Sequence, residues 1–168
     1  MPQPSPRDFP SDLHPLLLDP NYWRGRLEEQ RLVPHFLLCL PRPDLSSPGC
    51  QVEEIRFRAH DSVRLWGLVG RCPLTVESQA MRMRVVGACE RPTISRAQVE
   101  GGAVEIVLQI PADRRLESRV MDVLRTCDMA QELAPDSHQE IVFAPAEGQP
   151  LPYELHIASR LRGMETLP

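Results

Sequence analysis

The sequence contains no lysine, so all 19 of its basic residues are arginine. A GC-rich genome that encodes arginine in preference to lysine explains this bias. A selected role for the guanidinium groups is the alternative, which their scattered positions do not favour. The net charge is −4, and a nucleic-acid surface usually needs a concentrated basic patch. The composition therefore predicts a protein that does not bind nucleic acid.

Long apolar runs are missing as well. No segment approaches the roughly 20 apolar residues of a membrane span. The N-terminal residues 1–10, MPQPSPRDFP, lack the apolar core of a secretory signal. We therefore expect a cytoplasmic protein that does not enter a membrane.

Motifs that hold metals or nucleotide cofactors are also absent from the sequence. The five cysteines form no C-x-x-C pair, and no histidine stands at zinc-ligand spacing from them. Buried free thiols in a reducing compartment are expected, with a disulfide framework or a metal site as the alternative. Neither G-x-G-x-x-G nor a P-loop occurs. The sequence predicts no cofactor and no metal.

The 168 residues, 42% apolar and 25% charged, are typical of a globular protein with one domain. Residues 1–18 begin with a proline-rich polar stretch, and we expect this segment to be disordered. Residues 19–168 are expected to form a single α/β domain. Asp19 and Pro20 are suited to begin a helix, as its cap and its first turn.

A β-hairpin is predicted at the start of the domain. Apolar residues alternate with charged ones over residues 51–59 and again over 63–69, and the link between them is short and polar. The preceding residues 34–49 contain four prolines, which indicates a connecting segment without a long regular element.

Two more strands follow. In residues 80–88, methionine and valine alternate with arginine, which predicts a solvated or helix-covered sheet face; a basic binding patch is the alternative. Residues 103–110 are almost continuously apolar, as in a central strand buried on both faces.

The last third of the chain predicts a helix at 116–133, a strand at 140–144 and a helix from 153 to 161. Hairpin strands that are followed by helix crossovers indicate an α/β fold. We therefore predict a mixed sheet with an antiparallel N-terminal hairpin.

Residues 139–150, QEIVFAPAEGQP, have the layout of a strand, a sharp turn and a helix. In α/β-hydrolases this layout carries the nucleophile in the form G-x-S-x-G. Glu147 stands where the serine would be expected. The segment thus predicts a hydrolase scaffold without its usual nucleophile.

Residues 21–70 resemble the N-terminal region of the acetyl xylan esterase and cephalosporin-C deacetylase group of α/β-hydrolases. That region combines an aromatic-Trp pair, here Tyr22-Trp23, with a P-G step, here Pro48-Gly49. It continues with a hairpin of the type V-x-x-I/V-x-F…D-G-x-x-I-x-G-x-L. The matching residues here are Val52, Ile55, Phe57, Asp61, Val63, Leu65, Gly67 and Val69, with Ser62 in place of the usual glycine.

Beyond residue 70 the resemblance is one of elements. The family's D-x-L-R-A-x-D pattern is matched by Asp122, Leu124, Arg125 and Asp128. The His-Gly oxyanion segment is replaced by residues 87–90, GACE, and the family's later strands, which bear the acid and the histidine, have no counterpart. The resemblance implies a shortened α/β-hydrolase-like domain without the catalytic serine, acid and histidine.

Two residues are candidates for a rearranged catalytic site. Glu147 could act as a carboxylate nucleophile or general base, and a polar turn residue at a helix entry is the alternative. Cys89 could act as a thiol nucleophile, and a buried structural thiol is the alternative. The pair His60-Asp61 is expected to lie exposed in the hairpin turn.

The sequence favours a protein that is not an enzyme and acts in protein binding or assembly. A hydrolase sheet cut after its fifth strand leaves an exposed edge at residues 140–144, which a homodimer or a protein partner would cover. The alternative is a deacetylase-like carboxylic-ester hydrolase that uses Cys89 or Glu147. A third reading is a fragment whose remaining segment is encoded elsewhere.

Overall fold

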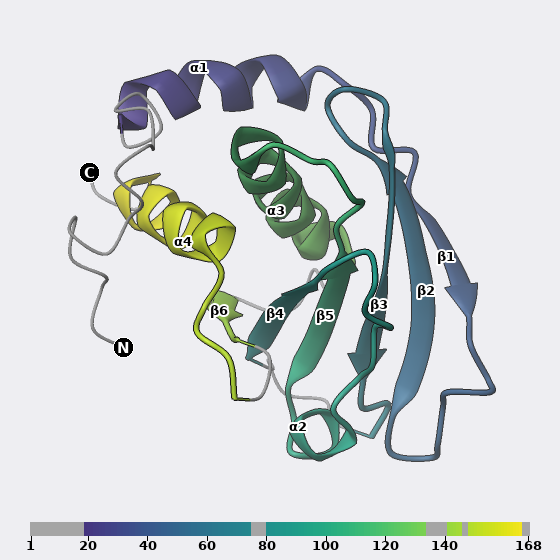
Figure 1. Ribbon diagram of the computed structural model, residues 1–168. Helices are drawn as coiled ribbons and strands as arrows, with labels where there is room; N and C mark the ends of the chain where they lie inside the picture. The colour runs from purple at the N-terminus through teal and green to yellow at the C-terminus, as the bar shows by residue number, and fades with distance from the viewer. Residues whose placement is uncertain (1–18, 75–79, 134–140, 146–147, 166–168) are drawn as a thin grey trace.

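The computed structural model describes residues 19–74, 80–133, 141–145 and 148–165. The disorder predicted for residues 1–18 and the candidate Glu147 lie outside these ranges. Within them the chain forms one six-stranded sheet with helices on both faces (Figure 1). No described helix has the length and apolarity required to cross a membrane.

The sheet is mixed, as predicted. Its spatial order is β1-β2-β3-β5-β4-β6, with antiparallel pairing from β1 to β5 and parallel pairing of β4 with both β5 and β6. The strands are β1 (Leu38–Pro41), β2 (Gln51–Arg58), β3 (Arg64–Arg71), β4 (Met81–Val86), β5 (Val104–Gln109) and β6 (Ile141–Phe143).

The predicted hairpin and central strand are confirmed. β2 and β3 pair in register from Gln51–Arg71 to Arg58–Arg64. In the turn between them Ser62 has a φ of 67°, a left-handed conformation that favours glycine, which is the residue expected there from the family pattern. In β5 every residue except Gln109 is buried.

One strand and one helix were not predicted. β1 lies within residues 34–49, where four prolines indicated only a connection, and it is a short edge strand that ends at Pro41. Helix α2 (Arg96–Glu100) has five residues, which is too short to produce a helical period in the sequence.

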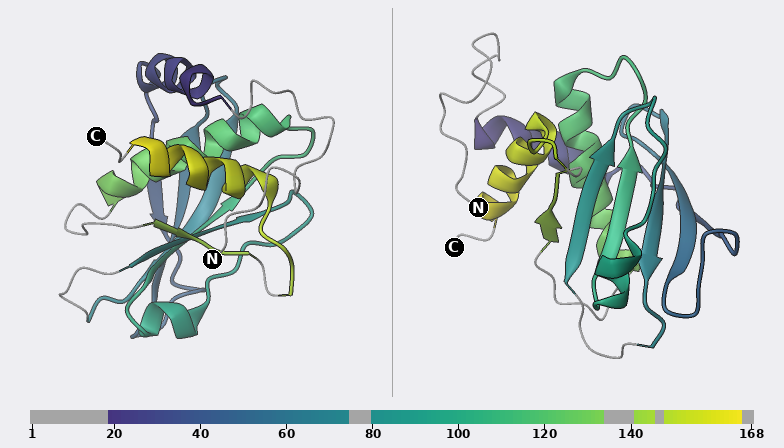
Figure 2. Two further views of the ribbon diagram at one scale, coloured as in Figure 1. Left: turned by 90° about the vertical axis from the view of Figure 1, so that its left-hand side faces the viewer. Right: turned by 60° about the horizontal axis from the view of Figure 1, so that its bottom comes forward.

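The helices are divided unequally between the two faces. α1 (Pro20–Arg31), α3 (Leu116–Leu133) and α4 (Tyr153–Glu165) lie on one face, and the short α2 lies on the other (Figure 2). α3 is covered by the sheet on one side and by α4 on another, so nearly all of its residues from Val120 to Ala130 are buried. The opposite face therefore has little helical cover, and a groove described below lies on it.

Candidate functional site

The carboxyl ends of the parallel strands form a crevice of about 290 Å³. From β4 the chain passes through α2 to β5 on one side, and from β5 it passes through α3 to β6 on the other side of β4. Open α/β sheets bind their ligands at such a point, where the strand order reverses. This crevice is therefore the position at which the fold would hold an active site.

The crevice is lined by charged groups. It combines three carboxylates, Glu90, Asp113 and Glu154, with the guanidinium groups of Arg114 and Arg119. The Nε atom of Arg119 is 4.0 Å from a carboxylate oxygen of Glu154. None of the described residues that line the crevice is a serine, threonine, cysteine or histidine. The described lining thus offers carboxylates but no hydroxyl or thiol nucleophile and no imidazole base.

Cys89 lies beside this crevice, between the lining residues Ala88 and Glu90, and it is exposed. The expectation of a buried structural thiol at this position is therefore wrong. Gln109 holds the segment, because its side-chain amide donates to the backbone carbonyls of Ala88 (3.4 Å) and Glu90 (3.0 Å). Of the other cysteines, Cys50, Cys72 and Cys127 are buried, and Cys39 is half-buried.

The strand–turn–helix layout expected around Glu147 is present in its described parts. β6 ends at Phe143, Ala144 after it is buried, and α4 begins at Tyr153. Glu147 itself lies outside the described residues. Its assignment as a catalytic candidate stays a prediction.

In the hairpin turn that follows β2, Asp61 is exposed as expected, and it also takes part in a charged network. Asp61 accepts a hydrogen bond from Arg114, which also donates to both carboxylate oxygens of Asp122 at 3.1 and 2.6 Å. His60 is half-buried, and its Nδ1 atom has no hydrogen-bond partner among the described residues. The expectation that His60 would be exposed is therefore wrong, and burial lowers its pKa.

Asp122 is fully buried on α3. Burial raises the pKa of its carboxyl to about 6, although the Arg114 guanidinium beside it acts in the opposite direction. The folded protein then binds a proton at Asp122 at a higher pH than the unfolded chain does. Stability from this group is greatest at low pH and is lost as the pH rises through about 6.

We expect Asp122→Asn to remove this pH dependence. Between pH 4 and pH 6 the wild-type free energy of unfolding should fall, relative to that of the variant, by roughly 2 kcal/mol. Urea unfolding of both proteins across this range measures the difference. A difference that stays constant with pH, or that grows as the pH rises, would contradict the assignment.

Arg125, the arginine of the D-x-L-R-A-x-D pattern, is buried beneath the N-terminal arm, which consists of α1 and the connection to β1. Its guanidinium donates to the backbone carbonyls of Gln30 (3.0 Å), Val33 (2.8 Å), Pro34 (2.9 Å) and Arg58 (2.6 Å). These carbonyls belong to the end of α1, the connection to β1 and the end of β2. Arg125 thus links the N-terminal arm and the β2–β3 hairpin to α3 through hydrogen bonds. The arginine of the family pattern therefore has a structural role in this chain.

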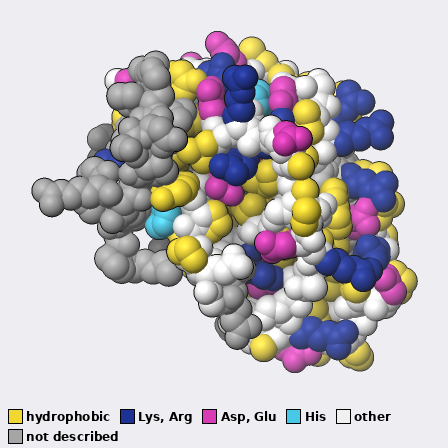
Figure 3. All heavy atoms as spheres, in the orientation of Figure 1, with side chains coloured by type: hydrophobic (Ala, Val, Ile, Leu, Met, Phe, Trp, Pro, Cys, Tyr) yellow, Lys and Arg dark blue, Asp and Glu magenta, His cyan; other side chains and the backbone are white. Residues whose placement is uncertain are grey.

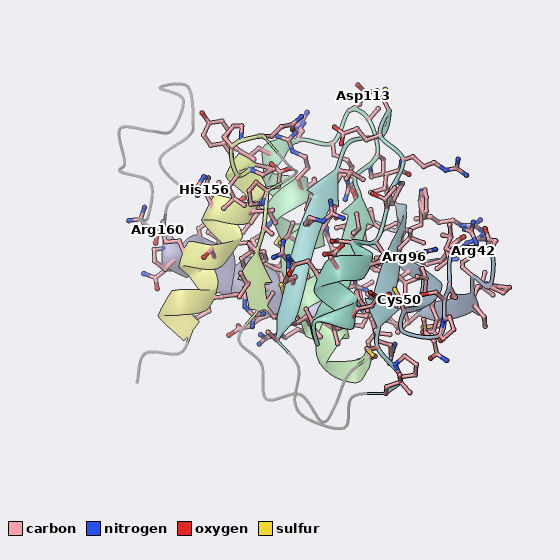
Figure 4. All side chains as sticks on the ribbon, turned by 90° about the horizontal axis from the view of Figure 1, so that it is seen from below. Arg42, Cys50, Arg96, Asp113, His156 and Arg160 are labelled. Atoms are coloured by element: carbon pink, nitrogen blue, oxygen red, sulfur yellow. The ribbon has the colours of Figure 1, made fainter. Side chains whose placement is uncertain are left out.

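A larger groove of about 1030 Å³ lies on the face of the sheet that carries α2. β1, β2 and β3 contribute its floor, and the segments 42–50 and 91–96 contribute its sides. Figure 4 shows Arg42 and Arg96 on this side of the sheet, far from His156 and Arg160 on α4. We call it the arginine groove because six arginines line it: Arg42, Arg56, Arg58, Arg64, Arg91 and Arg96.

Only part of this positive charge is neutralised. Arg42 forms ion pairs with Asp44 (2.8 Å) and Glu54 (3.0 Å), and Arg56 forms one with Glu54 (2.5 Å). Asp44 and Glu54 are the two carboxylates of the lining. In the space-filling view, dark blue side chains gather along the side of the molecule formed by β1 and β2 (Figure 3).

Sequence reasoning missed this groove because it treated the arginines as scattered. The available signal was the alternation of Arg56 and Arg58 with apolar residues, followed by Arg64 at the start of the next strand.

The arginines of β4, for which the sequence predicted a solvated or helix-covered sheet face, are half-buried on the same face as α2. Both face the fully buried Glu105, to which Arg84 donates at 2.9 Å, while Arg82 is 3.9 Å away.

No family model and no curated protein matches this sequence. Solved structures match the fold. An acetyl xylan esterase from Paenibacillus sp. R4 superimposes with a TM-score of 0.60 at 9% identity, over 75% of this chain and 50% of that chain. Acetyl xylan esterase 1 from Thermoanaerobacterium sp. JW/SL YS485 gives a TM-score of 0.59 at 9% identity, over 73% of this chain and 49% of that chain.

This chain has an α/β-hydrolase-like fold. The predicted resemblance to acetyl xylan esterases is confirmed at the level of the fold, because both structures cover about three quarters of the chain. The chain spans about half the length of these two esterases. At 9% identity the likeness describes the scaffold, and the chemistry has to be argued from the residues themselves.

Proposed function

We propose that this chain is a non-catalytic α/β-hydrolase-like domain that acts in protein binding or assembly. The observation that carries the proposal is the lining of the crevice at the strand ends. Its described residues offer carboxylates and guanidinium groups, whereas a triad needs a hydroxyl or thiol nucleophile and an imidazole base. Arg119 and Glu154 pair with each other within the crevice, so their charges have a partner without a substrate.

An edge of the sheet supports the binding role. β6 is the last strand in the sheet order and pairs only with β4 among the described strands. Val142 at its centre is 46% exposed. An edge strand with an exposed apolar side chain is suited to pair with another chain, and a second copy of this protein would supply an identical edge.

We expect the protein to be a dimer in solution and Val142→Lys to make it a monomer. A lysine at the centre of β6 places a charge on the edge that the partner would cover. Light scattering over a range of protein concentrations measures the mass. The matched control is Leu32→Lys, because Leu32 is exposed at the end of α1, and this variant should stay a dimer. A wild-type protein that is monomeric at high concentration would contradict the prediction.

The alternative is a carboxylic-ester hydrolase with a non-standard nucleophile. One observation favours it: the Cys89 thiol is exposed directly beside the crevice, where a substrate could reach it. Glu147 is the other candidate for this chemistry.

A further inference from the structure

We propose that the arginine groove binds an acidic, partly apolar protein segment. The proposal names a partner chemistry for the binding role proposed above, and it rests on that role only in assuming that the chain binds proteins. It concerns a different surface from the β6 edge, because the groove is formed by β1, β2 and β3 at the other side of the sheet.

The first indication is a pair of like charges on the floor of the groove. Arg58 and Arg64 stand directly opposite each other in the register of β2 and β3. Both side chains are exposed, and neither forms an ion pair with a described carboxylate. Like charges in directly opposite positions destabilise a sheet. A carboxylate bound between the two guanidinium groups would remove this repulsion and gain two charge-assisted hydrogen bonds.

A second pair of guanidinium groups stands on the side of the groove. Arg91 and Arg96 are exposed and have no ion-pair partner among the described residues. The lining contains six arginines and two carboxylates, in a chain whose net charge is −4. The groove is therefore a concentrated positive surface on an acidic protein, and it attracts an anionic ligand.

Apolar side chains lie between these charges. Phe36 is 66% exposed and Leu38 is 48% exposed, while Leu45 and Trp66 are half-buried. Exposed apolar surface in a groove with a charged rim is typical of a protein interaction site. A ligand that covers this surface must offer apolar side chains as well as carboxylates.

The same features disfavour a nucleic acid. Asp44 and Glu54 lie in the groove and would repel successive phosphates of a backbone. Binding of single-stranded nucleic acid relies on bases stacked on open aromatic faces. One face of the Phe36 ring is already occupied by the guanidinium of Arg58, whose carbon lies 5.1 Å from the ring centroid. A protein segment with alternating acidic and apolar residues fits both the arginines and the apolar side chains of the groove.

Trp66 provides a way to observe binding. The chain has two tryptophans, of which Trp23 is fully buried in the core and Trp66 lines the groove. A short synthetic peptide that alternates Glu with Leu and Phe should change the tryptophan emission of the full chain, and Trp66→Phe should abolish the change. Its counterpart with Gln in place of each Glu, and oligothymidylate, are the two comparison ligands.

The decisive variant is Arg58→Glu combined with Arg64→Glu, which should weaken binding of the acidic peptide at least about tenfold. The matched control, Arg24→Glu with Arg115→Glu, makes the same charge change at exposed positions on α1 and before α3, and it should bind like the wild type. Equal weakening in both variants, equal binding of the Gln peptide, no binding of the acidic peptide, or tighter binding of oligothymidylate would overturn the proposal. The proposed function is tested by the dimer mass and by esterase activity, and neither measurement depends on peptide binding in the groove. Failure of the groove and failure of the proposed function can therefore be told apart.

Discussion

Replacing Arg125 with methionine should lower the free energy of unfolding by about 3–5 kcal/mol. Arg125 is 1% exposed, and its guanidinium donates to four backbone carbonyls. Methionine fills much of the same volume but has no donor, so these carbonyls lose their partner inside the protein. An unsatisfied buried acceptor costs about 1–3 kcal/mol, and the arm of α1 would detach to recover some of that loss in water.

Urea unfolding followed by circular dichroism measures the change. Arg115→Met is the matched control, because Arg115 is exposed just before α3, and it should change stability by less than about 0.5 kcal/mol. Arg125→Lys should also destabilise the fold, since an ammonium group cannot reach carbonyls of three separate segments as a planar fork can. A loss below about 1 kcal/mol in Arg125→Met would contradict the structural role assigned to this residue.

Gly67→Ala should destabilise the fold by about 3 kcal/mol. Gly67 lies on β3 opposite Leu108 of the central strand β5. A Cβ atom at this position would lie 2.3 Å from the carbonyl oxygen of Val107 and 3.2 Å from the Cα of Leu108. Both are backbone atoms, so no side chain can rotate away, and the two strands would have to separate.

The matched control is Gly25→Ala in the interior of α1. A Cβ atom there meets nothing within 4 Å, so alanine should stabilise the helix by about 0.5–1 kcal/mol. Thermal unfolding of the two variants beside the wild type should therefore show shifts of opposite sign. A Gly67→Ala protein with wild-type stability would show that β3 and β5 do not approach as closely as described.

The regular parts of the fold could be predicted because their signal is local. Alternation within β2 and β3, and the unbroken apolar run of β5, each follow from burial of a single strand. Gly67 fitted the family pattern, and the structure gives the reason in its close contact with β5. β1 could not be predicted, because a four-residue strand among prolines has too few positions to show a period.

The surface features could not be predicted, because they depend on how distant segments come together. The arginine groove combines Arg58 and Arg64 with Arg91 and Arg96, which are separated along the chain and meet across the sheet. The exposure of Cys89 depends on a loop held by Gln109 of the neighbouring strand.

The central claim is that this hydrolase-like scaffold binds proteins without catalysing ester hydrolysis. The most direct test is hydrolysis of p-nitrophenyl acetate by the purified full chain, with Cys89→Ala and Glu147→Gln measured in parallel. The account predicts that all three proteins release p-nitrophenol at the rate of buffer alone. Activity of the wild type that is lost in either variant would contradict it and establish the ester hydrolase instead.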